Sequence, residues 1–188
     1  PNGLVLVVGG NTPGTVYALT DCALYDYTNN TWFEPSPLNF PHDQHGQVLL
    51  PNGTVLVMGG DDIAQCEIFD PGDSTWTVTD SLSSWGNQKS NVLLPDGRVL
   101  DVSGYNSSVT EIYDYKIGSW SNVDSMAVKR NEYSLTSLPT GDVLISGGAT
   151  TIPLSGTPVA TCELFNSSTE IWNPTGALDT ARAFHASV

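Results

Sequence analysis

Basic residues and long apolar runs are scarce in this chain of 188 residues. Six Lys and Arg residues face twenty Asp and Glu residues, which gives a formal net charge of −14. A polyanionic surface repels nucleic acid and anionic membranes, so we expect no nucleic-acid partner. No apolar run approaches the ~20 residues of a membrane-spanning helix, so we expect no membrane insertion. No stretch combines helical periodicity with capping residues, so the chain is predicted to be all-β.

Cysteine is also rare, with Cys22, Cys66 and Cys162 alone in the sequence. Each lies three residues before an aromatic residue, at the same place in a repeated pattern. Such equivalent positions lie beyond disulfide reach in a repeat fold, so we predict small buried apolar side chains. No Cys-x-x-Cys pair of the kind that holds zinc occurs, and we expect neither metal nor cofactor.

A single motif occurs four times. Each copy has a Pro-x-Gly turn, a short apolar strand, a glycine-containing doublet, an aromatic residue and, seven positions later, a tryptophan. The turns begin at Pro1, Pro51, Pro95 and Pro139, the doublets are Gly9-Gly10, Gly59-Gly60, Ser103-Gly104 and Gly147-Gly148, the aromatics are Tyr25, Phe69, Tyr113 and Phe165, and the tryptophans are Trp32, Trp76, Trp120 and Trp172. A period of roughly 44 to 52 residues is typical of propellers and solenoids.

Each repeat reads as four short strands bounded by turn residues. In the second repeat the first strand contains Gln47 to Leu50, the next contains Val55 to Met58, the third contains Cys66 to Phe69, and the fourth begins at Trp76. The predicted repeats span approximately 1–40, 41–84, 85–128 and 129–180, within a single domain that covers 1–188. We assign the four aromatic–tryptophan pairs to the core, because large apolar rings suit contacts between stacked sheets.

These residues resemble the kelch repeat of β-propellers, which has a glycine doublet followed by spaced Tyr and Trp residues. Leu94-Pro95-Asp96-Gly97-Arg98-Val99-Leu100 is similar to the form seen in galactose-oxidase-like and bacterial kelch proteins. The resemblance implies that every repeat forms one four-stranded propeller blade. The third repeat departs from the pattern, with Ser103 before Gly104.

The chain begins within a repeat, so we expect a piece of a mature or longer polypeptide. The segment 181–188 reads as a first strand, which is innermost in kelch blades, and it is predicted to complete the blade begun at Pro1. Three arrangements remain open: a closed ring of four blades, part of a larger ring, or two chains that share one ring.

The resemblance also implies that ligands meet the loops that lead into the innermost strands. Alignment on the turns places basic and aromatic side chains together near the predicted axis: His42, His45, Lys89, Arg130, Tyr133, Arg182 and His185. This cluster is the predicted binding face, for an anionic or polar ligand on a protein or glycan partner. The alternative is that Arg and His side chains bind the backbone of neighbouring blades.

An enzyme of the galactose oxidase or glyoxal oxidase kind would need two tyrosines, two histidines and a cysteine cross-linked to one tyrosine. His45, His185 and Tyr133 have plausible places, but there is no adjacent Tyr-His pair and no cysteine in a loop near the axis. No Gly-x-Ser-x-Gly nucleophile motif occurs either. Asp61-Asp62 suggests calcium, but a solvated loop explains the pair as well. We therefore expect no catalytic activity.

Four N-glycosylation sequons begin at Asn29, Asn52, Asn106 and Asn166, all in predicted turns or loops. They favour a secreted glycoprotein. The sequence thus predicts an extracellular, non-catalytic module that binds protein or glycan. The alternatives are a self-assembling structural subunit of a filament and a fragment of a copper oxidase.

Overall fold

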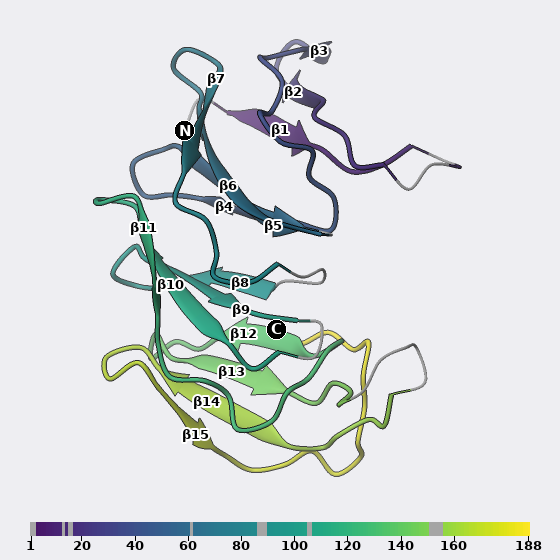
Figure 1. Cartoon of the computed structure of the whole chain (residues 1–188), viewed down its shortest axis with the longest axis vertical. Coiled ribbons are helices and arrows are strands. Elements are labelled where there is room, and N and C mark those ends of the chain that lie inside the picture. Colours follow the sequence, from purple (N-terminus) through teal and green to yellow (C-terminus); the bar gives the residue numbers. More distant parts are fainter. Residues whose placement is uncertain are drawn as a thin grey trace. The chain divides into compact units, whose positions relative to one another are not determined.

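The computed structural model describes residues 3–12, 14, 17–60, 62–85, 90–104, 107–150 and 156–188. Within these ranges the regular structure consists of β-strands and includes no helix, as predicted. The strands form four antiparallel sheets (Figure 1). The chain divides into two compact units, Pro1–Trp85 and Gly86–Val188, and each unit contains two sheets.

The first unit contains a three-stranded and a four-stranded sheet. The strands of the first sheet, in spatial order, are β1 (Leu4–Val8), β2 (Cys22–Asp26) and β3 (Thr31–Phe33). Those of the second sheet are β4 (Gly46–Leu49), β5 (Val55–Gly60), β6 (Ile63–Asp70) and β7 (Thr75–Thr79).

The second unit contains two four-stranded sheets with the same simple up-and-down order. The third sheet consists of β8 (Ser90–Leu93), β9 (Val99–Val102), β10 (Thr110–Asp114) and β11 (Ser119–Asn122). The fourth consists of β12 (Ser134–Ser137), β13 (Val143–Ser146), β14 (Cys162–Asn166) and β15 (Ile171–Pro174).

The repeated aromatic and tryptophan residues are cross-strand partners in the hairpin that the last two strands of every sheet form. The pairs are Tyr25–Trp32, Phe69–Trp76, Tyr113–Trp120 and Phe165–Trp172. Their ring centroids lie 4.8, 5.0, 5.1 and 5.2 Å apart. The seven-residue spacing therefore encodes a hairpin in which the two rings are tilted against each other.

Each unit has its own apolar core between its two sheets. In the first unit the core joins Val8, Cys22 and Leu24 of the first sheet to Phe69 and Trp76 of the second. In the second unit the core includes Leu100, Ile112, Ile145, Phe165 and Trp172. Both cores arise because strands of this repeat bury one face only when a neighbouring sheet covers it.

The glycine doublets lie where the chain leaves the second strand of a sheet. Both glycines have a positive φ in the first, second and fourth doublets, with 55° and 90° at Gly9 and Gly10. Neither Ser103 nor Gly104 has a positive φ, so the third doublet turns differently. This difference is the structural counterpart of the serine in the third repeat.

The prediction of a strand over residues 181–188 is wrong for the described structure. The first sheet has three strands, and residues 181–188 form none. The segment lies instead beside β12, where the Ser187 hydroxyl hydrogen-bonds the hydroxyls of Ser134 and Thr136 (Figure 1). A strand needs a partner ladder, and the side-chain contacts of Ser187 do not supply one.

Candidate binding face and the inner-strand loops

Three described loops have the same position in their repeats, and we call them the inner-strand loops: residues 42–45, 130–133 and 182–185. The first two lead into β4 and β12. The third residue of each loop has a left-handed backbone, with φ of 49° at Gln44, 51° at Glu132 and 57° at Phe184. The loops therefore share a left-handed residue at the same position despite different side chains.

His42 is fully buried, with no exposed surface. Its Nδ1–H donates to the carbonyl of Gly59 over 2.7 Å, and its Nε2 lies 3.3 Å from Oε1 of Glu67. Burial by itself raises the pKa of Glu67, but hydrogen bonds from His42 and from Asn39 and Phe40 lower it below its usual value. His42 and Glu67 thus form an internal polar pair with no surface available to a ligand.

Arg130 takes the place of His42 in the fourth repeat and is also fully buried. Its Nη1 donates to the carbonyls of Gly147 and Thr161, over 3.0 and 2.7 Å. Its Nη2 lies 2.6 Å from Oε1 of Glu163. The guanidinium therefore binds the backbone and a carboxylate of its own repeat, whereas the alternative that the sequence left open placed these contacts on a neighbouring blade.

Tyr133 is buried too, and its hydroxyl donates to the carbonyl of Val102 over 2.7 Å. Burial, aided by the negative charge of Asp101, raises the pKa of the phenol, which keeps it neutral. Tyr133 joins the third and fourth sheets of the second unit. It has too little exposed surface to form a binding face.

The histidines at the ends of two inner-strand loops are only partly buried. His45 lies with its ring centroid 5.8 Å from that of His42, and burial together with His42 lowers its pKa to about 4. The Nε2 of His185 is 3.1 Å from the Ser146 hydroxyl. Arg182 is exposed. Lys89 lies outside the described residues. Among the described members of the predicted binding cluster, surface is exposed on Arg182, His45 and His185.

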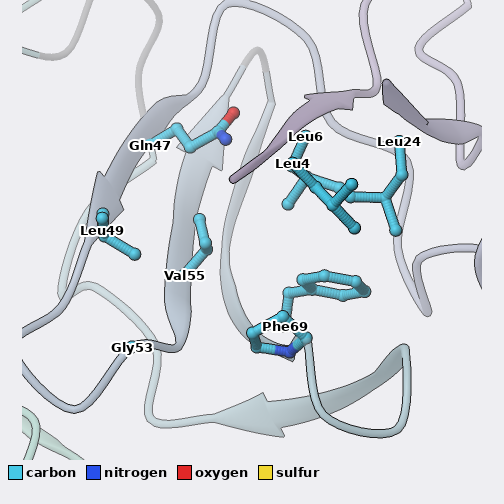
Figure 2. A pocket seen from close by; sticks show the side chains of 9 residues that line it. Leu4, Leu6, Leu24, Gln47, Leu49, Gly53, Val55 and Phe69 are labelled. Carbon is cyan, nitrogen blue, oxygen red and sulfur yellow. The ribbon is translucent and has the colours of Figure 1, made fainter. Parts of the chain in front are cut away.

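An apolar cleft of about 300 Å³ opens between the two sheets of the first unit. Figure 2 shows Leu4, Leu6 and Leu24 on one side and Phe69 and Val55 on the other. Among the lining residues, Gln47 is the one with a polar side chain. The cleft is the open end of the seam between two sheets, and its lining offers dispersion contacts with little to orient a polar ligand.

The assignment of all four tryptophans to the core is wrong for the first repeat. Trp32 is 58% exposed, whereas Trp76 is 9% and Trp172 is 6% exposed. The Nε1–H of Trp76 donates to the Ser36 carbonyl, and that of Trp172 to the Thr110 hydroxyl, so both rings lie against the preceding sheet of their unit. The spacing of the aromatic residue and the tryptophan is the same in every repeat, so it gave no signal for the exposure of Trp32.

Asn29 and Asn52 lie in hairpin turns, as predicted, whereas Asn166 is the last residue of β14, directly before its hairpin turn, and Asn106 lies outside the described residues. Asn29 and Asn52 are exposed, while Asn166 is half-buried. The Asn52 Oδ1 accepts hydrogen bonds from the backbone and hydroxyl of Thr54, which leaves its Nδ2 free for a glycan. The Nδ2 of Asn29 donates to Asp26 over 2.7 Å.

The three cysteines are buried free thiols, which confirms their prediction as small buried side chains. Burial raises the pKa of the Cys22 thiol. Of the Asp61-Asp62 pair, Asp61 lies outside the described residues, and Asp62 has a positive φ of 60°. In the part of the chain that the structure describes, no group of three or more His, Cys, Asp or Glu side chains is arranged to hold a metal ion.

No protein-family model and no curated protein sequence matches the chain. The resemblance to kelch repeats therefore depends on the repeated residues themselves. Over the described ranges, no helix has the length and apolarity that crossing a membrane requires.

Proposed function

We propose that this chain is a secreted, N-glycosylated kelch propeller module without catalytic activity, which binds protein through an exposed sheet face. The observation that carries the proposal is the exposure of Trp32, 58% against 9% and 6% for Trp76 and Trp172. Tyr27 and Phe33 of the same hairpin are 62% and 43% exposed. Exposed large aromatic side chains are typical of protein interaction sites.

The partner that fits this face is another sheet of the same repeat. Trp76 and Trp172 both pack against such a sheet, and Trp32 has the same hairpin geometry as they have. A second copy of the chain presents one in its fourth sheet. Leu164 and Leu178 there are only half-buried, whereas their counterparts Leu24 and Leu38 are 3% and 4% exposed.

Sedimentation velocity across a wide range of chain concentrations tests the proposal. We expect the wild-type mass to rise with concentration and Trp32→Ser to remain monomeric. Trp85→Ser is the matched control, because Trp85 is 57% exposed, and it should associate like the wild type. A wild-type chain that stays monomeric throughout, or a Trp32→Ser variant that still associates, would contradict the proposal.

The secreted, glycosylated state is tested by expression in a secreting eukaryotic cell, followed by enzymatic removal of N-glycans. We expect a mass shift that decreases in Asn52→Gln, since Asn52 is exposed and its Nδ2 is free. Secreted protein with no mass shift would contradict this part.

A further inference from the structure

The buried base–glutamate pair occurs twice with the same geometry. His42 contacts Glu67, and Arg130 contacts Glu163, at 3.3 and 2.6 Å. In both repeats the glutamate stands two residues before the aromatic of the third strand, Phe69 or Phe165. All four ionisable side chains are almost completely buried.

The glutamate carboxylate also accepts two backbone N–H groups from the residues just before the base. Glu67 accepts from Asn39 and Phe40, over 2.9 and 2.8 Å. Glu163 accepts from Ala127 and Val128, over 2.8 and 3.4 Å. The carboxylate thus contacts two backbone N–H groups and the basic side chain, all from one short segment. These contacts fix that segment to its sheet.

Arg182 occupies the position of His42 and Arg130, and its backbone is held in the same way. Its carbonyl accepts from the Gly148 N–H over 2.8 Å, as the His42 carbonyl accepts from Gly10 over 2.8 Å. Its Nε donates to the carbonyl two residues earlier, Thr180, over 3.3 Å, as Arg130 donates to Val128 over 3.3 Å. Arg182 and Arg130 therefore share the hydrogen bond from Nε to the backbone two residues earlier.

The carboxylate that completes the arrangement is missing among the described residues. Arg182 makes no ion pair there, and it is exposed where its counterparts are fully buried. Asp179 and Thr180, whose counterparts donate N–H groups to the glutamate, are exposed as well. Asp179, Thr180 and Arg182 thus repeat the donor positions of the two buried pairs, and all three residues are exposed.

We propose that residues 179–182 bind the glutamate carboxylate of a further sheet of this repeat. The inference rests on the proposed function, recognition between repeat sheets, and it adds that residues 179–182 favour a glutamate-bearing sheet over the first sheet of a second copy. The first sheet lacks the glutamate, because Ala23 stands two positions before Tyr25. β2 therefore supplies no carboxylate at this position, either in this chain or in a second copy. The partner that binds residues 179–182 is a sheet with a glutamate there.

The test supplies such a sheet within the full chain. Val188 has the same repeat position as Val48, so a copy of residues 49–82 appended after Val188 continues the repeat and provides a second Glu67. Urea unfolding then compares three variants of the extended chain: Arg182→Gln, Glu67→Gln in the appended copy only, and the double variant. We expect each single variant to lower the urea midpoint, and the double variant to lower it no further than either single one.

Two controls separate pairing from a general charge effect. Lys129→Gln removes an exposed cation next to Arg130 and should leave the midpoint of the extended chain unchanged. Arg182→Gln in the chain without an extension should also leave the midpoint unchanged. A second extension, a copy of residues 137–174 with its own Glu163, serves if the first does not fold.

Two outcomes would overturn the inference. One is that Arg182→Gln and the appended Glu67→Gln lower the urea midpoint additively, and the other is that Arg182→Gln does not lower it in either extension. The proposed function is judged separately, by the Trp32-dependent mass in sedimentation. Self-association that persists while Arg182 has no effect would retain the proposed function and reject the carboxylate site.

Discussion

At the second and fourth glycine doublets the backbone leaves no room for a β-carbon. A β-carbon at Gly60 would lie 2.5 Å from the carbonyl oxygen of Asp43, and one at Gly148 would lie 2.6 Å from that of Asn131. Both glycines also have a positive φ, of 142° and 99°. The doublets therefore fix the distance between the second strand and the inner-strand loop of the same sheet.

Gly60→Ala is expected to lower the free energy of unfolding by at least about 1–3 kcal/mol, the cost of a strained backbone conformation, because the carbonyl of Asp43 must also move. Urea unfolding measures the loss. Gly176→Ala is the control, since its added carbon meets nothing within 4 Å. Equal losses from the two variants would contradict the explanation.

His45 should make stability depend on pH. The folded chain lowers its pKa to about 4, against about 6.5 in an unfolded chain, so the unfolded state binds the proton more tightly. The unfolding free energy is then expected to fall as the pH drops from about 6.5 toward about 4. His45→Gln should flatten this dependence, while Gln47→Ala, an exposed neighbour, should not. Parallel pH profiles for wild type and His45→Gln, from urea titrations at each pH, would count against it.

Among the elements, the buried ion pair attaches the segment before a first strand to the third strand of the same sheet. Arg130 and Glu163 are 33 residues apart in sequence and 2.6 Å apart in space. Breaking a buried pair leaves a charge without its partner, which costs more than the pair contributes when intact. This attachment accounts for the complete burial of His42 and Arg130, two of the predicted ligand-binding residues.

Arg130→Gln is expected to lower the unfolding free energy by about 3–5 kcal/mol, since Glu163 then remains buried and unpaired. Arg98→Gln is the matched comparison. The Arg98 side chain is 27% exposed in its pairs with Asp96 and Glu170, so its loss should cost about 0–1 kcal/mol. Thermal or urea unfolding of the two variants measures the difference, and similar losses would show that burial does not set the strength of these pairs.

For the whole molecule, the net charge of −14 opposes association of copies. Added salt screens this repulsion, so the association through Trp32 should strengthen with ionic strength and with divalent cations. Light scattering at constant chain concentration and pH measures the effect. Trp32→Ser should show no response, and a wild-type mass that is independent of salt would rule out charge as the barrier.

The sequence by itself determined most of the secondary structure, with residues 181–188 as the exception. The Pro-x-Gly turns, the apolar strands and the seven-residue spacing of Phe69 and Trp76 are local signals, because a hairpin brings together residues close in sequence. The burial of Cys66 followed from its fixed place in the repeat. Local chemistry also placed the sequons at Asn29 and Asn52 in turns.

Only the tertiary structure decided which of the repeated side chains are exposed. Trp32 and Trp76 have the same local sequence pattern, yet one is solvent-exposed and the other is covered, because burial depends on whether another sheet lies against the hairpin. Arg130 and Arg182 differ in the same way, since the carboxylate that buries one of them comes from a strand distant in sequence. Equivalent positions of the inner-strand loops share a left-handed residue, but their environment is set by long-range packing, which a local pattern does not encode.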